Sequence, residues 1–198
     1  MELIFCLEII GTIAFAISGA YMAIVMEMDI FGVIVMGMTT AVGGGIIRDL
    51  ILGVTPPLAF QNPVYAIISI VVSICVFLFR KRRIRNLENI ILLLMDTIGL
   101  GVFTIVGVRA GMPFNNMFLS IFVGSLTGVG GGILRDIFAG VKPSIFVKNF
   151  YASASITGAV VATLLWNFDM NIAMITGALS VIVLRLLAVH FQWSLPKA

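Results

Sequence analysis

The chain of 198 residues is 61% hydrophobic and only 11% charged, and its mean hydropathy is +1.18. A water-soluble domain carries about 25% charged residues, so this composition excludes a soluble protein and predicts that lipid surrounds most of the chain. The formal net charge is +3, and five of the twelve basic residues lie in one short segment, 80–85.

Seven apolar segments are long enough to cross the hydrocarbon core of a bilayer, which takes about 20 helical residues. Each segment is continuously apolar and does not alternate, so the spans are predicted to be helices and not barrel strands. The predicted fold class is an all-α membrane protein with seven transmembrane helices. They are expected near residues 3–25, 31–52, 61–79, 89–110, 114–139, 147–166 and 170–191.

The first span resembles a signal peptide in its position but not in its charges. Glu2 stands at its leading end without a Lys or Arg, and Glu8 interrupts the apolar run. A signal peptide begins with a basic region followed by an uninterrupted apolar one. We therefore expect this span to be retained in the membrane.

The basic segment 80–85, between the third and fourth spans, sets the expected orientation. Short loops rich in Lys and Arg stay in the cytoplasm, which places the N-terminus outside and, after seven spans, the C-terminus inside the cell membrane. Lys142, Lys148 and Lys197 then fall on the same inner side. A basic run beside a span is the ordinary topology signal, so no nucleic-acid partner is expected.

One pattern occurs twice, as MTTAVGGGIIRDLILG at 38–53 and as SLTGVGGGILRDIFAG at 125–140, at an offset of 87 residues. The first span also aligns with the fourth at an offset of 88, which pairs Glu8 with Asp96 and Phe15 with Phe103. We predict a three-helix repeat at 1–83, a second one at 88–167, and a seventh helix with a tail at 168–198. Three crossings per unit turn the second copy upside down, a plan typical of transport proteins with a site near the midplane.

The two glycine triplets fall near the middle of the second and fifth spans. A glycine in a helix interior costs about 1 kcal/mol relative to alanine, and freed backbone groups in a membrane are tolerated only beside protein or water. The triplets are predicted to kink the helices and to present half-helix ends and loose carbonyls to a pathway; the alternative is close packing of small residues. Pro56 and Pro143 are expected to end these helices. The glycines are Gly43, Gly44, Gly45, Gly130, Gly131 and Gly132.

Four charges follow the glycines: Arg48, Asp49, Arg135 and Asp136. Ionisable groups at this depth face the protein interior and mark a pathway or a paired structure. Adjacent helical residues point about 100° apart, so we expect crossed pairs, Arg48 with Asp136 and Arg135 with Asp49. The four charges either line and gate a pore together with the glycines, or form buried ion pairs that fix the packing of the repeats.

Glu8, Asp96 and Arg185 are further intramembrane charges. The two carboxylates occupy equivalent places and are predicted either to attract cations at the two entrances or to pair with Arg185 or Arg109. Arg185 is expected to be such a partner or to extend toward the inner surface.

Small residues form stripes on two other spans. Ala154, Gly158 and Ala162 recur at i, i+4 and i+8, and Ser69 and Ser73 recur at i and i+4. Each stripe is predicted to face another helix of the same protomer or another protomer.

Nothing in the chain indicates an enzyme or a cofactor. The single histidine, His190, lies near the end of the last span, and Cys6 and Cys75 lack metal-ligand spacing. The glycine triplet lacks the lysine of a phosphate-binding loop. We expect no catalysis, no cofactor and no metal, and membrane lipids but no obligatory protein partner.

The doubled GGGxxRDxxxG and the three-plus-three-plus-one arrangement resemble the prokaryotic trimeric intracellular cation (TRIC) channel family, from Leu3 to about Leu187. The resemblance implies a homotrimer with a pore in each protomer, which conducts monovalent cations such as potassium or sodium and is gated around the second and fifth helices. It places Gly43 to Gly45, Arg48, Gly130 to Gly132 and Arg135 at the constriction. Some bacterial relatives are associated with glycine uptake, so a secondary transporter of glycine or another small amino acid is the alternative. No potassium-filter sequence occurs, so cation selectivity is expected to be modest.

Overall fold

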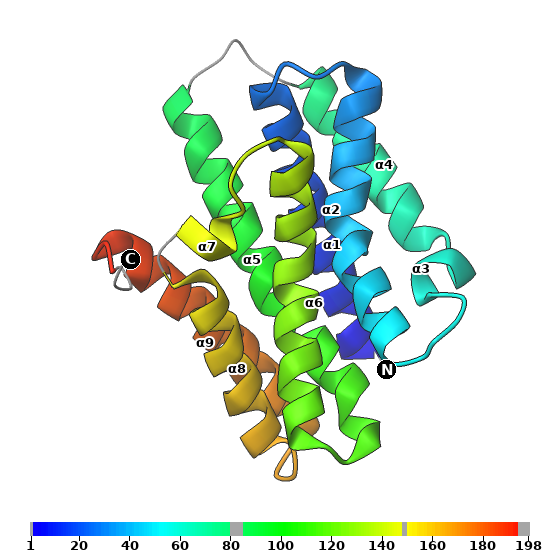
Figure 1. The fold of residues 1–198 in the computed structure, drawn as a ribbon, viewed down its shortest axis with the longest axis vertical. Helices are drawn as coiled ribbons and strands as arrows, with labels where there is room; N and C mark the ends of the chain where they lie inside the picture. Colours follow the sequence, from blue (N-terminus) through cyan, green and yellow to red (C-terminus); the bar gives the residue numbers. More distant parts are fainter. Residues whose placement is uncertain (1, 80–84, 148–149, 194–198) are drawn as a thin grey trace.

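The computed structural model describes residues 2–79, 85–147 and 150–193, which form a bundle of helices (Figure 1). Most of the basic segment, together with Lys148 and Lys197, lies outside the described residues, so the orientation stays a prediction. The helices are α1 (Glu2–Val25), α2 (Ile30–Ile51), α3 (Leu58–Gln61), α4 (Val64–Leu78), α5 (Arg85–Gly111), η1 (Met112–Phe114), α6 (Met117–Phe138), α7 (Ser144–Val147), α8 (Tyr151–Leu165) and α9 (Met170–His190).

Five of these helices, α1, α2, α5, α6 and α9, are long and apolar enough to cross a membrane. The predicted spans at 61–79 and 147–166 each contain one 15-residue helix, α4 or α8, which is shorter than expected, and a one-turn helix, α3 or α7, precedes each of them. Pro63 precedes α4, and Phe150 precedes α8 in a left-handed conformation, so neither short helix continues directly into the next. The fold is an all-α membrane protein, and its described residues form five clear spans and two shorter apolar helices.

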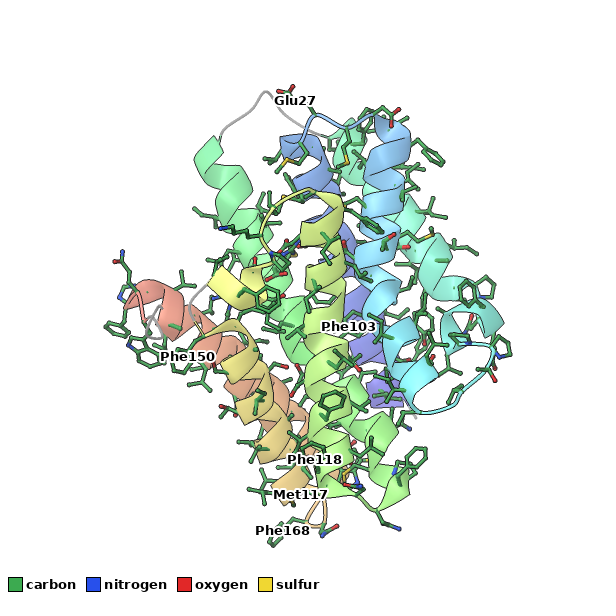
Figure 2. All side chains as sticks on the ribbon, in the orientation of Figure 1. Glu27, Phe103, Met117, Phe118, Phe150 and Phe168 are labelled. Carbon is green, nitrogen blue, oxygen red and sulfur yellow. The ribbon has the colours of Figure 1, made fainter. Side chains whose placement is uncertain are left out.

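The surface around the bundle is apolar, as lipid requires. Large hydrophobic side chains point outward from most helices (Figure 2), among them Phe118, which is 77% exposed. Glu27 marks one end of the bundle and Phe168 the other (Figure 2). The two chain segments near these residues therefore lie at opposite ends of the molecule.

Helices α1 and α5 pack together through reciprocal contacts between equivalent residues. The rings of Phe15 and Phe103 lie 5.3 Å apart between centroids. A Cβ atom on Gly99 would overlap the Phe15 ring, and one on Gly11 would lie 3.0 Å from the Phe103 ring. Each glycine thus makes room for the phenylalanine of the other helix, as a two-fold relation between the copies requires.

The helices that carry the doubled motif end at glycines and not at prolines. Gly53 and Gly140 adopt left-handed conformations, with φ of 73° and 67°. The following amides of Val54 and Val141 donate back to the carbonyls of Asp49 and Asp136, at 2.8 and 3.0 Å. This is the Schellman type of helix end, which favours glycine. The prediction that Pro56 and Pro143 end these helices is therefore wrong, because the chain has already turned before it reaches them.

Both small-residue stripes face neighbouring helices of the same chain. Ser69 and Ser73 are fully buried, and a Cβ atom on Gly37 of α2 would overlap the Ser73 hydroxyl. On α8, Gly158 lies against α9, where its carbonyl oxygen would be 3.0 Å from a Cβ atom on Gly177. Small residues allow these backbones to approach closely. The stripes are therefore internal contacts of one protomer.

Candidate functional site

The glycine triplets lie where α2 and α6 cross. Figure 1 shows these helices side by side and running in opposite directions. A Cβ atom on Gly44 would overlap the carbonyl oxygen of Thr127, and one on Gly131 would overlap that of Thr40. Gly44 and Gly131 are 87 positions apart, and so are Thr40 and Thr127, so equivalent residues make equivalent contacts on the two helices. These two glycines bring the backbones into contact.

Both helices run unbroken through their triplets. The prediction of half-helix ends and loose carbonyls at the triplets is therefore wrong. Backbone groups in a membrane are satisfied most completely inside a continuous helix, and close packing against the partner helix compensates for the low helix propensity of glycine. The alternative, close packing of small residues, describes Gly44 and Gly131.

Each arginine of the motif pairs with the aspartate that follows it. Arg48 Nε lies 2.8 Å from Asp49 Oδ1, and Arg135 Nε lies 2.9 Å from Asp136 Oδ1. The crossed pairs are therefore wrong. The directions of the two Cβ atoms differ by about 100°, but the arginine side chain is long enough for its guanidinium group to turn toward its neighbour.

The second oxygen of each aspartate holds the segment that follows the helix. Asp49 Oδ2 accepts a hydrogen bond from the Leu58 amide at 2.8 Å, and Asp136 Oδ2 accepts one from the Ser144 amide at 2.7 Å. These bonds satisfy amides at the start of the short helices α3 and α7, which would otherwise lack acceptors. The Arg-Asp motif therefore connects the crossing to the chain beyond it.

The second copy of the motif belongs to a closed network of buried groups, which we call the second half-site. Arg135 Nη1 donates to Asp96 Oδ1 of α5 and to Ser18 Oγ of α1, each at 2.5 Å. The Tyr151 hydroxyl of α8 donates to the same Asp96 oxygen at 3.1 Å. Arg135 is 1% exposed. The members of the second half-site are Ser18, Asp96, Arg135, Asp136 and Tyr151.

The first copy has an equivalent set of groups, but these border a cavity. In this first half-site, which consists of Glu8, Arg48, Asp49 and Tyr65, the Tyr65 hydroxyl donates to Glu8 Oε2 at 2.5 Å. Three of its members line a chamber of about 260 Å³: Glu8, Arg48 and Tyr65. Gly45 borders this chamber too, and the nearest atom to a Cβ built on it would be Arg48 Nη2, at 3.8 Å.

A wider vestibule of about 620 Å³ adjoins the chamber. Its wall includes η1 and the connection between α8 and α9, which lie at the end of the bundle marked by Phe168 (Figure 2). Arg109 and Asn115 add polar groups to this wall. The vestibule and the chamber share four lining residues: Glu8, Arg48, Leu58 and Val106.

The space beside the third glycine of the triplet is filled in the second half-site and open in the first. A Cβ atom on Gly132 would lie 2.5 Å from the Tyr151 hydroxyl, whereas the equivalent position on Gly45 opens on the chamber. Glu8 borders both cavities, while Asp96 is 4% exposed and bound to Arg135. Equivalent residues therefore occupy an open and a closed environment.

The remaining predicted charges have separate places. Arg109 lines the vestibule. Arg185 is buried, with its guanidinium carbon 5.0 Å from the centroid of the Tyr151 ring. Sequence reasoning missed Tyr65 and Tyr151 because they are 86 positions apart and fall outside the offsets of 87 and 88. Both tyrosines stand at the start of the last helix of their repeat, α4 or α8, and this shared position was the signal that could have revealed them.

Known proteins resemble the chain over nearly its whole length. The family model described as "Glycine transporter" matches residues 5–81 and 93–167. The UPF0126 inner membrane protein YadS of Escherichia coli K12 is 37% identical over 98% of this chain and 95% of that protein.

Solved structures of similar sequence share the fold. A TRIC cation channel is 38% identical, with a TM-score of 0.86 over 98% of this chain and 96% of that one. The TRIC orthologue from Rhodobacter sphaeroides is 30% identical, with a TM-score of 0.91 over 97% of this chain and all of that one. The chain therefore belongs to the prokaryotic TRIC family and carries two copies of the membrane domain that the family model describes.

Proposed function

We propose that the protein is a monovalent cation channel with a pore in each protomer. The observation that carries the proposal is the vestibule, which leads past Glu8 and Arg48 into the chamber beside the α2–α6 crossing. The similar solved structures are of cation channels, which supports the same function here. The permeant ion is potassium or sodium, and no cofactor takes part.

In this proposal Glu8, which lines both cavities, attracts cations where the vestibule and the chamber meet. A carboxylate at a pore entrance raises the local concentration of cations. The positive charge of Arg48 opposes this effect, but Asp49 neutralises it at 2.8 Å. Tyr65 holds the Glu8 carboxylate beside the chamber through its hydroxyl.

The second half-site acts as the gate. Beyond the crossing, Arg135 is fixed by Asp96, Ser18 and Asp136, and Tyr151 occupies the space beside Gly132. Opening requires the Tyr151 hydroxyl and the Arg135 guanidinium group to separate from Asp96. Separation would leave buried charges without their partners, which is unfavourable, so this network favours the closed state.

The proposed assembly is a homotrimer in the inner membrane, with the N-terminus outside and the vestibule open to the outside. The Rhodobacter sphaeroides relative is named as a trimeric channel, and YadS is named as an inner membrane protein. Helices α4 and α8, at 15 residues each, are about 22 Å long. Together with α3 and α7 they complete two further crossings, which makes seven.

Recording from purified protein in planar bilayers tests the proposal. We expect unitary currents in potassium and sodium gradients, with reversal potentials that show cation over anion preference. A silent bilayer together with saturable glycine uptake by liposomes of the same preparation would overturn the channel and support a transporter. The observation that favours this second candidate is the pair of equivalent half-sites in opposite states, one open and one closed, as alternating access requires.

A further inference from the structure

Helix α9 has no counterpart in the first repeat, yet it is packed tightly against the second. It lies against α5 and α8. A Cβ atom on Gly101 of α5 would be 3.0 Å from the Ala178 carbonyl oxygen, and one on Gly177 would be 2.8 Å from the Ala162 Cβ atom of α8. Backbones in such contact leave little freedom for α9 to move independently of these two helices.

Arg185 of α9 connects this packing to the second half-site. It is 2% exposed, and its guanidinium carbon lies 5.0 Å from the centroid of the Tyr151 ring. The hydroxyl of that ring donates to Asp96, which holds Arg135. A continuous chain of contacts therefore runs from the unrepeated helix to the arginine of the motif.

The charges of this region balance. Arg135 and Arg185 carry two positive charges, while Asp96 and Asp136 carry two negative ones, and all four side chains are buried. A cation over an aromatic face that is shielded from solvent is attracted more strongly than at an exposed site. The charge of Arg185 also favours the orientation in which the Tyr151 hydroxyl donates its hydrogen bond to the Asp96 carboxylate. Arg185 therefore restrains both the position of the Tyr151 ring and the direction of its hydroxyl.

We propose that Arg185 is a positioning residue that keeps the second half-site closed by holding Tyr151 against Asp96. This inference rests on the proposed function, in which the second half-site is the gate. Helix α9, the predicted seventh span, then has the role of making two otherwise equivalent half-sites unequal. In the first half-site, Tyr65 holds Glu8 but borders an open chamber.

Channel recording of Arg185→Met tests the proposal against a purely structural role. We expect the ratio of open to closed time to rise about thirtyfold, the size of effect that loss of a desolvated cation–π contact produces, with unitary conductance unchanged. Arg185→Lys keeps a cation above the ring and should restore most of the wild-type ratio. Tyr151→Phe keeps the ring but removes the hydroxyl, and should also favour the open state.

Ser180→Ala on the same helix is the matched control, because its hydroxyl bonds within α9 to Thr176. It should leave the open-to-closed ratio unchanged. If Arg185→Met does not fold, Arg185→Gln, which removes the charge but keeps a polar side chain, carries the test and should raise the ratio in the same way. A wild-type open-to-closed ratio in Tyr151→Phe, or an unchanged ratio in Arg185→Met, would overturn the proposal.

A spectroscopic measurement keeps the inference separate from the channel function. The chain has three tyrosines, Tyr21, Tyr65 and Tyr151, so labelling with 3-fluorotyrosine gives three ¹⁹F resonances. Arg185→Met should shift and sharpen the Tyr151 resonance as the ring gains mobility, while the Tyr65 resonance stays in place. This response in a protein that carries no current would retain the positioning role and reject the channel. An unchanged Tyr151 resonance would reject the positioning role, whatever the currents show.

Discussion

At the residue scale, the same residue types perform different tasks in the two copies of the motif. Arg48 and Arg135 each bind the adjacent aspartate, but Arg135 also binds Asp96 and Ser18, while Arg48 borders the chamber. The identity of a residue therefore sets its pairing with its neighbour. Its burial and the helices around it set what else it can do.

Glu8 and Arg109 allow a test of the entrance with opposite signs. Both side chains line the vestibule. Neutralising Glu8 with Glu8→Gln should lower the potassium conductance about two- to fivefold at low salt, because the local cation concentration falls. Arg109→Gln, the matched variant, should raise it. Equal changes in the same direction would show that surface charge at the vestibule does not control conduction.

The aspartates of the motif should differ in their contribution to stability. Asp136→Ala removes one of the two carboxylates that pair with Arg135, which is 1% exposed, and also removes the acceptor of the buried Ser144 amide, so it should cost about 1–3 kcal/mol. Asp49→Ala should cost less, because Arg48 borders a cavity that can admit water. Thermal unfolding of the purified variants in one detergent would measure the order. An equal loss at both positions would contradict the asymmetry.

At the element scale, the crossing of α2 and α6 is the contact that the other helices surround. Gly44 and Gly131 bring the two backbones together, and Asp49 and Asp136 attach the following segments. The glycines therefore fix where the helices cross. Their tolerance to substitution depends on which way each one faces, and not on their shared place in a triplet.

Alanine substitutions along one triplet should separate packing from cavity positions. Gly44→Ala places a Cβ atom on the Thr127 carbonyl oxygen and should cost about 1–3 kcal/mol, the usual range for overpacking. In Gly45→Ala the nearest atom is 3.8 Å away, so this control should fold as the wild type does. Thermal unfolding of both variants checks the difference. Because alanine favours a helix more than glycine does, a similar loss for both variants would contradict the assignment of Gly45 to an open position.

At the scale of the whole molecule, the two ends of the bundle are chemically distinct. The vestibule opens at the end marked by Phe168, and Glu27 lies at the opposite end (Figure 2). The proposed orientation places the Phe168 end outside. Access to the vestibule from one side of the membrane follows from this arrangement.

Cysteine labelling in cells would test that orientation. In a background without Cys6 and Cys75, Phe168→Cys should react with a membrane-impermeant thiol reagent in spheroplasts. Glu27→Cys should react only after the membrane is permeabilised. The reverse pattern would invert the assignment and turn the vestibule toward the cytoplasm.

The sequence by itself determined the class of the protein and its internal repetition. Apolar runs of membrane length and a motif repeated at one offset predict helices and equivalent positions, because hydropathy and local spacing act along the chain. They also located both Arg-Asp motifs beside the glycine triplets. These properties need no knowledge of which helices touch.

Only the tertiary structure decided the partners of the charges and the state of each half-site. The angle between adjacent residues predicts crossed pairs, but a flexible arginine reaches its neighbour. Asp96 and Ser18 bind Arg135 from two other helices, and Tyr151 binds Asp96 from a third. The unrepeated α9 then covers one half-site and not the other. Such asymmetry comes from contacts between distant segments, which no local pattern in the chain encodes.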